Sequence, residues 1–139
     1  MRVEEVMTSP VVTVGPGATL RTAVGAMLDA RVGSVVVTDG GPAGILTRSD
    51  ALRAAHDAGA AFSELTVSDA VRGELITVGP RATVEAALRR MDEHGVKKLP
   101  VTDGVDLVGI VTATDVAEHL PGRVREVQAD MERRDDWTG

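Results

Sequence analysis

Two segments of the chain place a threonine three residues before an aspartate, directly after a β-branched apolar run. The pairs are Thr47 with Asp50, and Thr112 with Asp115. This spacing is typical of a capping box, in which the two side chains satisfy free amide groups at a helix start. A carboxylate held there can also accept bonds from both hydroxyls of a ribose, and a helix start attracts anions. The pattern alone favours the capping role, and the two roles are compatible.

Both segments belong to a repeat that covers most of the chain. Residues 3–50 can be laid over residues 67–115 with one inserted residue, and identical residues coincide along the whole length. The pairs include Thr13/Thr77, Gly15/Gly79, Pro16/Pro80, Met27/Met91, Asp39/Asp103, Gly44/Gly109, Thr47/Thr112 and Asp50/Asp115. A tandem repeat is the economical explanation. We expect the two copies to pack face to face and to leave two equivalent clefts.

Each copy shows the same order of patterns, β-α-β-β-α. The first copy predicts a strand at 11–14, a helix from Leu20 to Ala30 capped by Thr19, a hairpin of strands 34–38 and 43–46, and a closing helix at 48–57. The second copy predicts strands at 75–78, 98–102 and 107–111, a helix at 83–93 and a helix from Ala113. A short segment before each copy, 3–7 and 67–71, predicts one or two helical turns.

Composition limits the classes of function. The chain has 139 residues, a net charge of −6 and a pI near 5.0, which argues against a nucleic-acid-binding face because phosphate neutralisation needs clustered cations. It has no cysteine, which excludes disulfides and thiolate chemistry. There is no signal peptide and no apolar run of about 18 residues, so we expect a cytoplasmic protein without membrane contact. Scattered histidines and serines without a nucleophile context predict that the chain is not an enzyme.

The doubled order, the Thr-Val-Gly-Pro-x-Ala-Thr stretches and the Gly-x-x-Thr-x-x-Asp junctions together resemble a pair of cystathionine β-synthase (CBS) domains, the unit called a Bateman module. The resemblance covers about residues 3–120. It implies an α/β (α+β) fold of two β-α-β-β-α motifs packed with pseudo-two-fold symmetry. We divide the chain into a first motif with its lead segment (1–62), a second motif (63–120) and a helical tail (121–139).

In that family, clefts between the motifs bind adenosine derivatives such as AMP, ADP, ATP or S-adenosylmethionine. By the resemblance, Asp50 and Asp115 bind ribose, and four hydroxyl side chains lie near the ribose or phosphate: Thr47, Ser49, Thr112 and Thr114. The residues implied for the adenine slots are Ala18, Ala23, Val35 and Val36 in one cleft, and Ala82, Ala87, Leu99 and Pro100 in the other. The alternative for each of these apolar residues is a position in the core.

The only lysines of the chain, Lys97 and Lys98, stand where many ligand-binding relatives carry basic residues that meet phosphates. The alternative is a solvated pair at a strand edge. The first copy has Gly33 and Ser34 there, so the two clefts should differ. We predict that the cleft that gathers Lys97 or Lys98 with Arg48 binds a phosphorylated nucleotide better than adenosine.

The leading hypothesis is a regulatory sensor whose adenine nucleotide is a regulatory ligand rather than a catalytic cofactor. Its output must act in trans on an effector protein, through the different affinities of the loaded and empty forms. Alanine-rich helical faces predict a homodimer. The alternative is a ligand-independent scaffold protein in which the same threonines and aspartates serve only as helix caps. A metal-linked regulator has only general family precedent.

Overall fold

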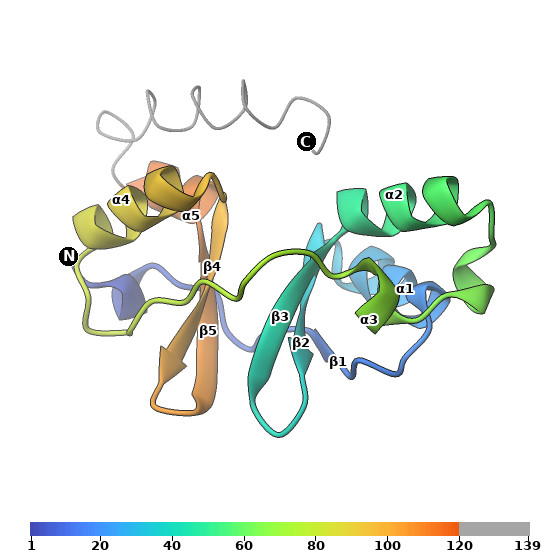
Figure 1. Ribbon diagram of the computed structural model, residues 1–139. Helices are drawn as coiled ribbons and strands as arrows, with labels where there is room; N and C mark the ends of the chain where they lie inside the picture. The colour runs from blue at the N-terminus through green and yellow to red at the C-terminus, as the bar shows by residue number, and fades with distance from the viewer. Residues whose placement is uncertain (120–139) are drawn as a thin grey trace. The chain divides into compact units, whose positions relative to one another are not determined.

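The computed structural model describes residues 1–119, which divide into two compact units (Figure 1). One unit comprises residues 12–75 and is called the first-repeat unit. The other joins residues 1–11 to residues 76–119 and is called the second-repeat unit. The predicted helical tail, 121–139, lies outside the described residues. Within residues 1–119, no helix has the length and apolar character needed to span a membrane.

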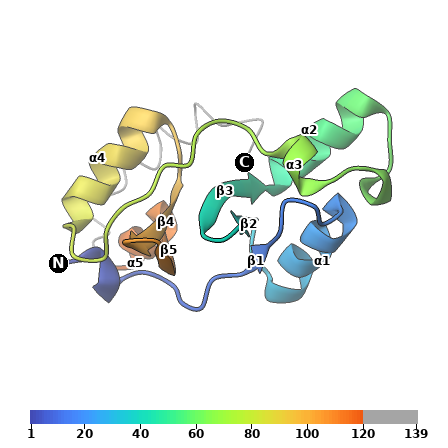
Figure 2. The same ribbon diagram turned by 60° about the horizontal axis from the view of Figure 1, so that its bottom comes forward.

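The first-repeat unit has the element order that its sequence predicts. Its elements are β1 (Thr13–Val14), α1 (Leu20–Ala30), β2 (Ser34–Thr38), β3 (Pro42–Thr47), α2 (Arg48–Ala58), the 3-10 turn η2 (Phe62–Glu64) and α3 (Val67–Ala70). The sheet order is β1-β2-β3, with β1 and β2 parallel and β2 and β3 antiparallel. Figures 1 and 2 show α1 and α2 on the same side of this sheet. The core of the unit lies between the sheet and these helices, as the buried Leu20, Val35 and Ala51 show.

The second-repeat unit contains the 3-10 turn η1 (Val3–Glu5), α4 (Val84–His94), β4 (Lys98–Asp103), β5 (Asp106–Thr112) and α5 (Ala113–His119). Its sheet has two antiparallel strands, β4 and β5. The buried core residues are all Val, Ala, Leu or Met, and Met91 and Leu99 have no exposed surface. The helix predicted to begin near Ala113 begins there.

The strand predicted at 75–78 is wrong, because only Val78 forms a bridge, a parallel one with Val101. In the first-repeat unit the amide of Val36 donates to the carbonyl of Val12 at 3.0 Å. The corresponding residue in the second-repeat unit is Pro100, which has no N–H to donate. The parallel ladder therefore cannot extend toward residue 76. The carbonyl of Thr77 instead accepts a bond from the Arg90 guanidinium, Nε to O 2.6 Å.

Helix α1 begins after its predicted cap, Thr19, and α4 begins one residue later than predicted, because Thr83 is its cap and not its first residue. The hydroxyl of Thr19 accepts from the amide of Thr22 at 3.1 Å, and the hydroxyl of Thr83 accepts from the amide of Ala86 at 3.1 Å. Apolar residues at helical spacing predict a core face of α1 that is formed by Leu20, Ala23, Val24, Met27 and Ala30. Ala30 is exposed instead, because it occupies the last turn of the helix, beyond the buried Met27.

The lead segments are exchanged between the repeats. The amide of Val3, which precedes the first copy, donates to the carbonyl of Ala82 in the second copy at 2.9 Å. The amide of Val67, which precedes the second copy, donates in the same way to Ala18 in the first copy at 2.8 Å. Val3 and Val67 have no exposed surface and belong to the cores of those units. The packing units thus differ from our sequence division at residues 62 and 63, since each repeat completes its core with the other repeat's lead segment.

Candidate functional site

The strand-to-helix junction has the same geometry in both units. In the first-repeat unit, the amide of Thr47 donates to Oδ2 of Asp50 at 3.0 Å, and the amide of Asp50 donates to Oγ1 of Thr47 at 3.1 Å. In the second-repeat unit, the corresponding distances between Thr112 and Asp115 are 3.1 and 3.0 Å. Both pairs are reciprocal capping boxes, so the structural role that the spacing favours is confirmed.

The two aspartates have different neighbours beyond the cap. The guanidinium of Arg53 lies near Asp50, with Nη1 3.6 Å from Oδ1. Within residues 1–119, Asp115 forms no ion pair, but the hydroxyl of Thr8 approaches its Oδ2 at 3.5 Å, the outer limit for a hydrogen bond. Sequence reasoning missed both neighbours. The i, i+3 spacing of Asp50 and Arg53 could have revealed the first, whereas Thr8 reaches Asp115 only because the lead segments are exchanged.

The glycines of the two junction motifs lie beneath the exchanged segments. A Cβ added to Gly109 would stand 2.5 Å from Sδ of Met7 and 3.1 Å from the carbonyl oxygen of Thr8. A Cβ added to Gly44 would stand 3.0 Å from Cγ1 of Val71. Thr8 also pairs with Ile110 through two backbone bonds of 2.8 and 3.0 Å. The glycine in Gly-x-x-Thr-x-x-Asp therefore permits close approach of the other repeat's lead segment.

The residues implied for the adenine slots separate into three groups. Four belong to the helix-covered cores with at most 1% exposure, which is the core alternative for each of them: Ala23, Val35, Ala87 and Leu99. Ala18 and Ala82 are half-buried against those cores and accept the bonds from the lead segments. Val36 and Pro100 are buried too, but strand alternation turns them to the opposite sheet face from Val35 and Leu99. Of the eight residues, only Val36 and Pro100 therefore face away from the helices of their own unit.

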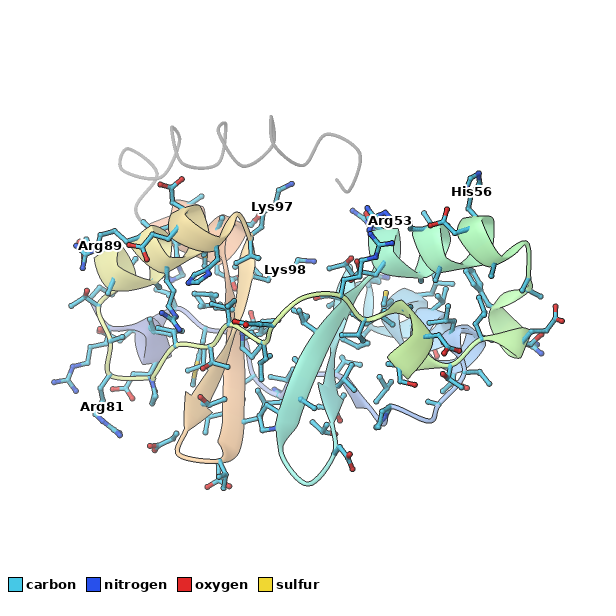
Figure 3. All side chains as sticks on the ribbon, viewed as in Figure 1. Arg53, His56, Arg81, Arg89, Lys97 and Lys98 are labelled. Carbon is cyan, nitrogen blue, oxygen red and sulfur yellow. The ribbon has the colours of Figure 1, made fainter. Side chains whose placement is uncertain are left out.

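The polar residues implied for phosphate contact lie around the junctions. Lys97 and Lys98 are half-buried where the connection from α4 enters β4 (Figure 3). The carbonyl of Lys97 accepts a bond from the amide of Ala113 at 2.9 Å, which fixes this corner to the start of α5. Arg48 and Thr114 are exposed and Ser49 is half-buried in the first turns of their helices.

A third capping box shows what the motif does outside the junctions. Oδ2 of Asp69 accepts from the amide of Thr66 at 3.0 Å at the start of α3. Hydrogen bonds from the backbone and side chain of Thr66 hold the pKa of Asp69 below its ordinary value. Asp69 has neither the preceding glycine nor the preceding strand of the junction motif, so it provides a matched control for a cap without a proposed binding role.

The described part of the chain contains no candidate metal site. Residues 1–119 contain no group of three or more histidines, aspartates or glutamates that could hold a metal ion.

In comparisons with known proteins, one family model matches both copies of the repeat. The CBS domain family model matches residues 3–57 and 67–122. The chain is 36% identical over 117 residues to the CBS domain-containing protein YhcV of Bacillus subtilis, covering 83% of this chain and 82% of that protein. It is 32% identical over 119 residues to hypoxic response protein 1 of Mycobacterium tuberculosis, covering 84% and 83%.

Solved structures agree with the fold. Hypoxic response protein I, crystallised with two coordinated zinc ions, matches with a TM-score of 0.77 and 30% identity over 87% of this chain and 100% of that chain. The CBS domain pair of protein MJ0100, crystallised with 5′-methylthioadenosine and S-adenosylmethionine, matches with a TM-score of 0.79 and 21% identity over 88% and 98%. At 21% identity, the second likeness shows the fold alone.

Proposed function

We propose that this chain, which belongs to the CBS-domain family and contains two CBS domains, is a cytoplasmic regulatory module that binds an adenosine derivative. The ligand is AMP, ADP, ATP or S-adenosylmethionine, and it changes the affinity of the chain for an effector protein in trans. The chain has no catalytic activity of its own. The observation that carries the proposal is the identical placement of Asp50 and Asp115 at the strand-to-helix junction of each unit.

Capping and ribose binding can occur on the same carboxylate. An ionised carboxylate has about four acceptor positions on its two oxygens. The cap in each unit uses Oδ2. A cis-diol can donate two hydrogen bonds to the carboxylate while the bond from the threonine amide persists. The cap then fixes the carboxylate before the ligand arrives, which lowers the entropic cost of binding.

The different neighbours of the two carboxylates predict different affinities. At Asp50 a ribose must compete with the Arg53 guanidinium, which lies 3.6 Å from Oδ1. Within residues 1–119, Asp115 has no such cation to displace. We therefore expect Asp115 to contribute more of the ribose affinity than Asp50. Protein MJ0100, described in its crystal structure with two adenosine compounds, shows that this fold can hold such ligands.

The second candidate is a ligand-independent interaction protein. The observation that favours it is that all the threonines and aspartates concerned already satisfy each other's backbone groups. In that case the aspartates stabilise helix starts and nothing more.

Isothermal titration calorimetry with adenosine, AMP, ADP, ATP and S-adenosylmethionine distinguishes the candidates. Under the sensor proposal at least one compound binds, and Asp115→Ala weakens binding by at least about tenfold, because a hydrogen bond to a charged group contributes roughly 1.5–3 kcal/mol. Asp50→Ala weakens binding less.

A bound ligand at 100 times its Kd should add about 2.7 kcal/mol to the free energy of unfolding, which thermal denaturation detects.

Asp69→Ala is the matched control, since it removes a capping carboxylate away from both junctions. It should lower stability, as the junction variants do, because it removes the acceptor of a cap, and it should leave ligand affinity unchanged. If all three variants lose stability and none of the five compounds binds the original chain, the sensor proposal is wrong and the scaffold function stands.

A further inference from the structure

The hydroxyl of Thr8 lies beside the carboxylate of Asp115, although no sequence motif assigns it to a binding site. Its Oγ1 is 3.5 Å from Oδ2, so the hydrogen bond is weak and the hydroxyl can turn toward a ligand at little cost. The two residues are 107 positions apart along the chain. Thr8 is exposed and Asp115 is half-buried, so they present a hydroxyl and a carboxylate together at the surface of the second-repeat unit.

Backbone contacts fix Thr8 in this position. Its amide donates to the carbonyl of Ile110 at 2.8 Å, and its carbonyl accepts from the amide of Ile110 at 3.0 Å. On one side of Thr8, Met7 packs against the core of the unit. On the other side, the hydroxyl of Ser9 donates to the carbonyl of Val108 at 3.1 Å. The Thr8 hydroxyl is therefore in place before a ligand arrives, which lowers the entropic cost of binding.

A carboxylate with a neighbouring hydroxyl can recognise a vicinal diol. Oδ2 of Asp115 accepts from the amide of Thr112 at 3.1 Å, and each carboxylate oxygen has about two acceptor positions. A ribose can therefore place one hydroxyl on each oxygen. The ribose hydroxyl on Oδ2 then lies beside Oγ1 of Thr8, which can donate one hydrogen bond and accept two. Two side chains bind that ribose hydroxyl, whereas the carboxylate alone binds the other.

The first-repeat unit has no hydroxyl at the position that corresponds to Thr8. By the repeat alignment this position is Arg72. The guanidinium of Arg72 lies near Asp57, with Nη2 4.0 Å from Oδ2, toward the other end of α2 from Asp50. The two junction aspartates therefore share a capping geometry, but only Asp115 has a hydroxyl from a lead segment beside it.

We propose that Thr8 binds the ribose of AMP together with Asp115 and makes this site selective for AMP over its deoxy forms. This inference rests on the proposed function, because it adds a residue and a selectivity to the site at Asp115. A deoxyribose without the hydroxyl beside Thr8 leaves two side chains unpaired. A site that is built to bind a hydroxyl rejects such an analogue strongly. The isomer that lacks the other hydroxyl should lose less affinity.

Isothermal titration calorimetry of the full 139-residue chain with AMP, 2′-deoxy-AMP and 3′-deoxy-AMP tests the proposal. An Asp50→Ala background removes the ribose carboxylate of the first-repeat unit. In this background Thr8→Val should weaken AMP binding by about two- to tenfold, the net contribution of one hydrogen bond. It should not weaken binding of the deoxy compound that lacks the hydroxyl beside Thr8, since that bond is already absent. Thr8→Ser keeps the hydroxyl and should bind AMP as the background chain does.

Ser9→Ala is the control, because it removes a neighbouring hydroxyl that bonds to Val108 instead. It should leave the affinity for all three nucleotides unchanged. Equal losses for all three nucleotides in Thr8→Val would indicate a structural role and would overturn the inference, as would unchanged AMP binding. A failure of AMP to bind the original chain also overturns it. The proposed function is wrong as well only if adenosine, ADP, ATP and S-adenosylmethionine also fail to bind.

Discussion

At the scale of single residues, the clearest departure from ordinary backbone preference is Arg31. It ends α1 in the left-handed conformation with φ 57°, whereas the corresponding ends of α2 and α4 carry Gly59 and Gly95 with φ 61° and 64°. Glycine has no Cβ and adopts this conformation without steric cost. The arginine therefore stands where the backbone favours glycine.

We predict that Arg31→Gly raises the free energy of unfolding by roughly 0.5 kcal/mol. The left-handed conformation costs a side-chain-bearing residue about 1 kcal/mol, and the added freedom of glycine in the unfolded chain offsets part of the gain. Urea denaturation measures the change. Gly95→Ala, the control, should lower stability at the corresponding cap. A loss of stability in Arg31→Gly would show that the arginine side chain stabilises the native state.

Residue types also explain which sequence predictions held at this scale. The capping role of Thr47, Asp50, Thr112 and Asp115 followed from spacing, because a capping box is a local interaction over four residues. The burial of Ala23 and Leu99 could not be separated from ligand contact in the sequence, because core positions and purine-slot positions use the same apolar side chains.

At the scale of elements, hairpins and helices were predicted closely, and the first strand of the second repeat was not. Glycine turns and helical spacing are local signals, so β2 and α1 have the predicted bounds. Pairing of residue 76 with β4 requires a backbone N–H at position 100, which is far away along the chain, and Pro100 has no N–H. The consequence of Pro100 could be read only after the register of the parallel pair was known.

The fit between lead segments and junction glycines gives a prediction at the element scale. Gly109→Ala should lower the free energy of unfolding by about 1–3 kcal/mol, the usual cost of overpacking, because its Cβ would meet both Met7 and the backbone of Thr8. Gly44→Ala should cost less, since its Cβ would meet only the side chain of Val71. Thermal denaturation of the two variants checks the order of the effects.

Adding Met7→Ala to Gly109→Ala is the control for this contact. The shorter side chain should restore part of the lost stability, while the carbonyl oxygen of Thr8, 3.1 Å from the new Cβ, should prevent full recovery. Equal stability of Gly109→Ala and the original chain would contradict the close packing of η1 and its following residues against β5.

At the scale of the whole molecule, the exchange of lead segments determines which pieces of the chain can fold. The core of the first-repeat unit includes Val67 and Ala70, which lie beyond the end of the first repeat. The core of the second-repeat unit includes Val3 and Val6, which lie before the first repeat. A cut at the sequence boundary therefore separates buried residues from the core they complete.

We predict that a chain of residues 12–75 unfolds cooperatively and that a chain of residues 1–62 does not. The chain of residues 12–75 keeps its whole core. The chain of residues 1–62 carries Val3 and Val6 without the residues they pack against, and it lacks Val67 and Ala70. Domains of about 60 residues are marginally stable, so the loss of two core residues is decisive. Circular dichroism during urea denaturation provides the measurement, and a cooperative transition in 1–62 alone would refute the exchanged packing.

The sequence by itself determined the repeat, the family, most helices and strands, and the reciprocal caps, because these depend on side-chain periodicity and on contacts within a few residues. Only the tertiary structure decided that each lead segment completes the other repeat's core, that Thr8 approaches Asp115, and that Leu28 and Leu52 are left exposed. These features join residues far apart along the chain. The two lead segments have similar apolar compositions, and either could fill either core. Their sequence pattern alone therefore does not indicate which core each segment packs against.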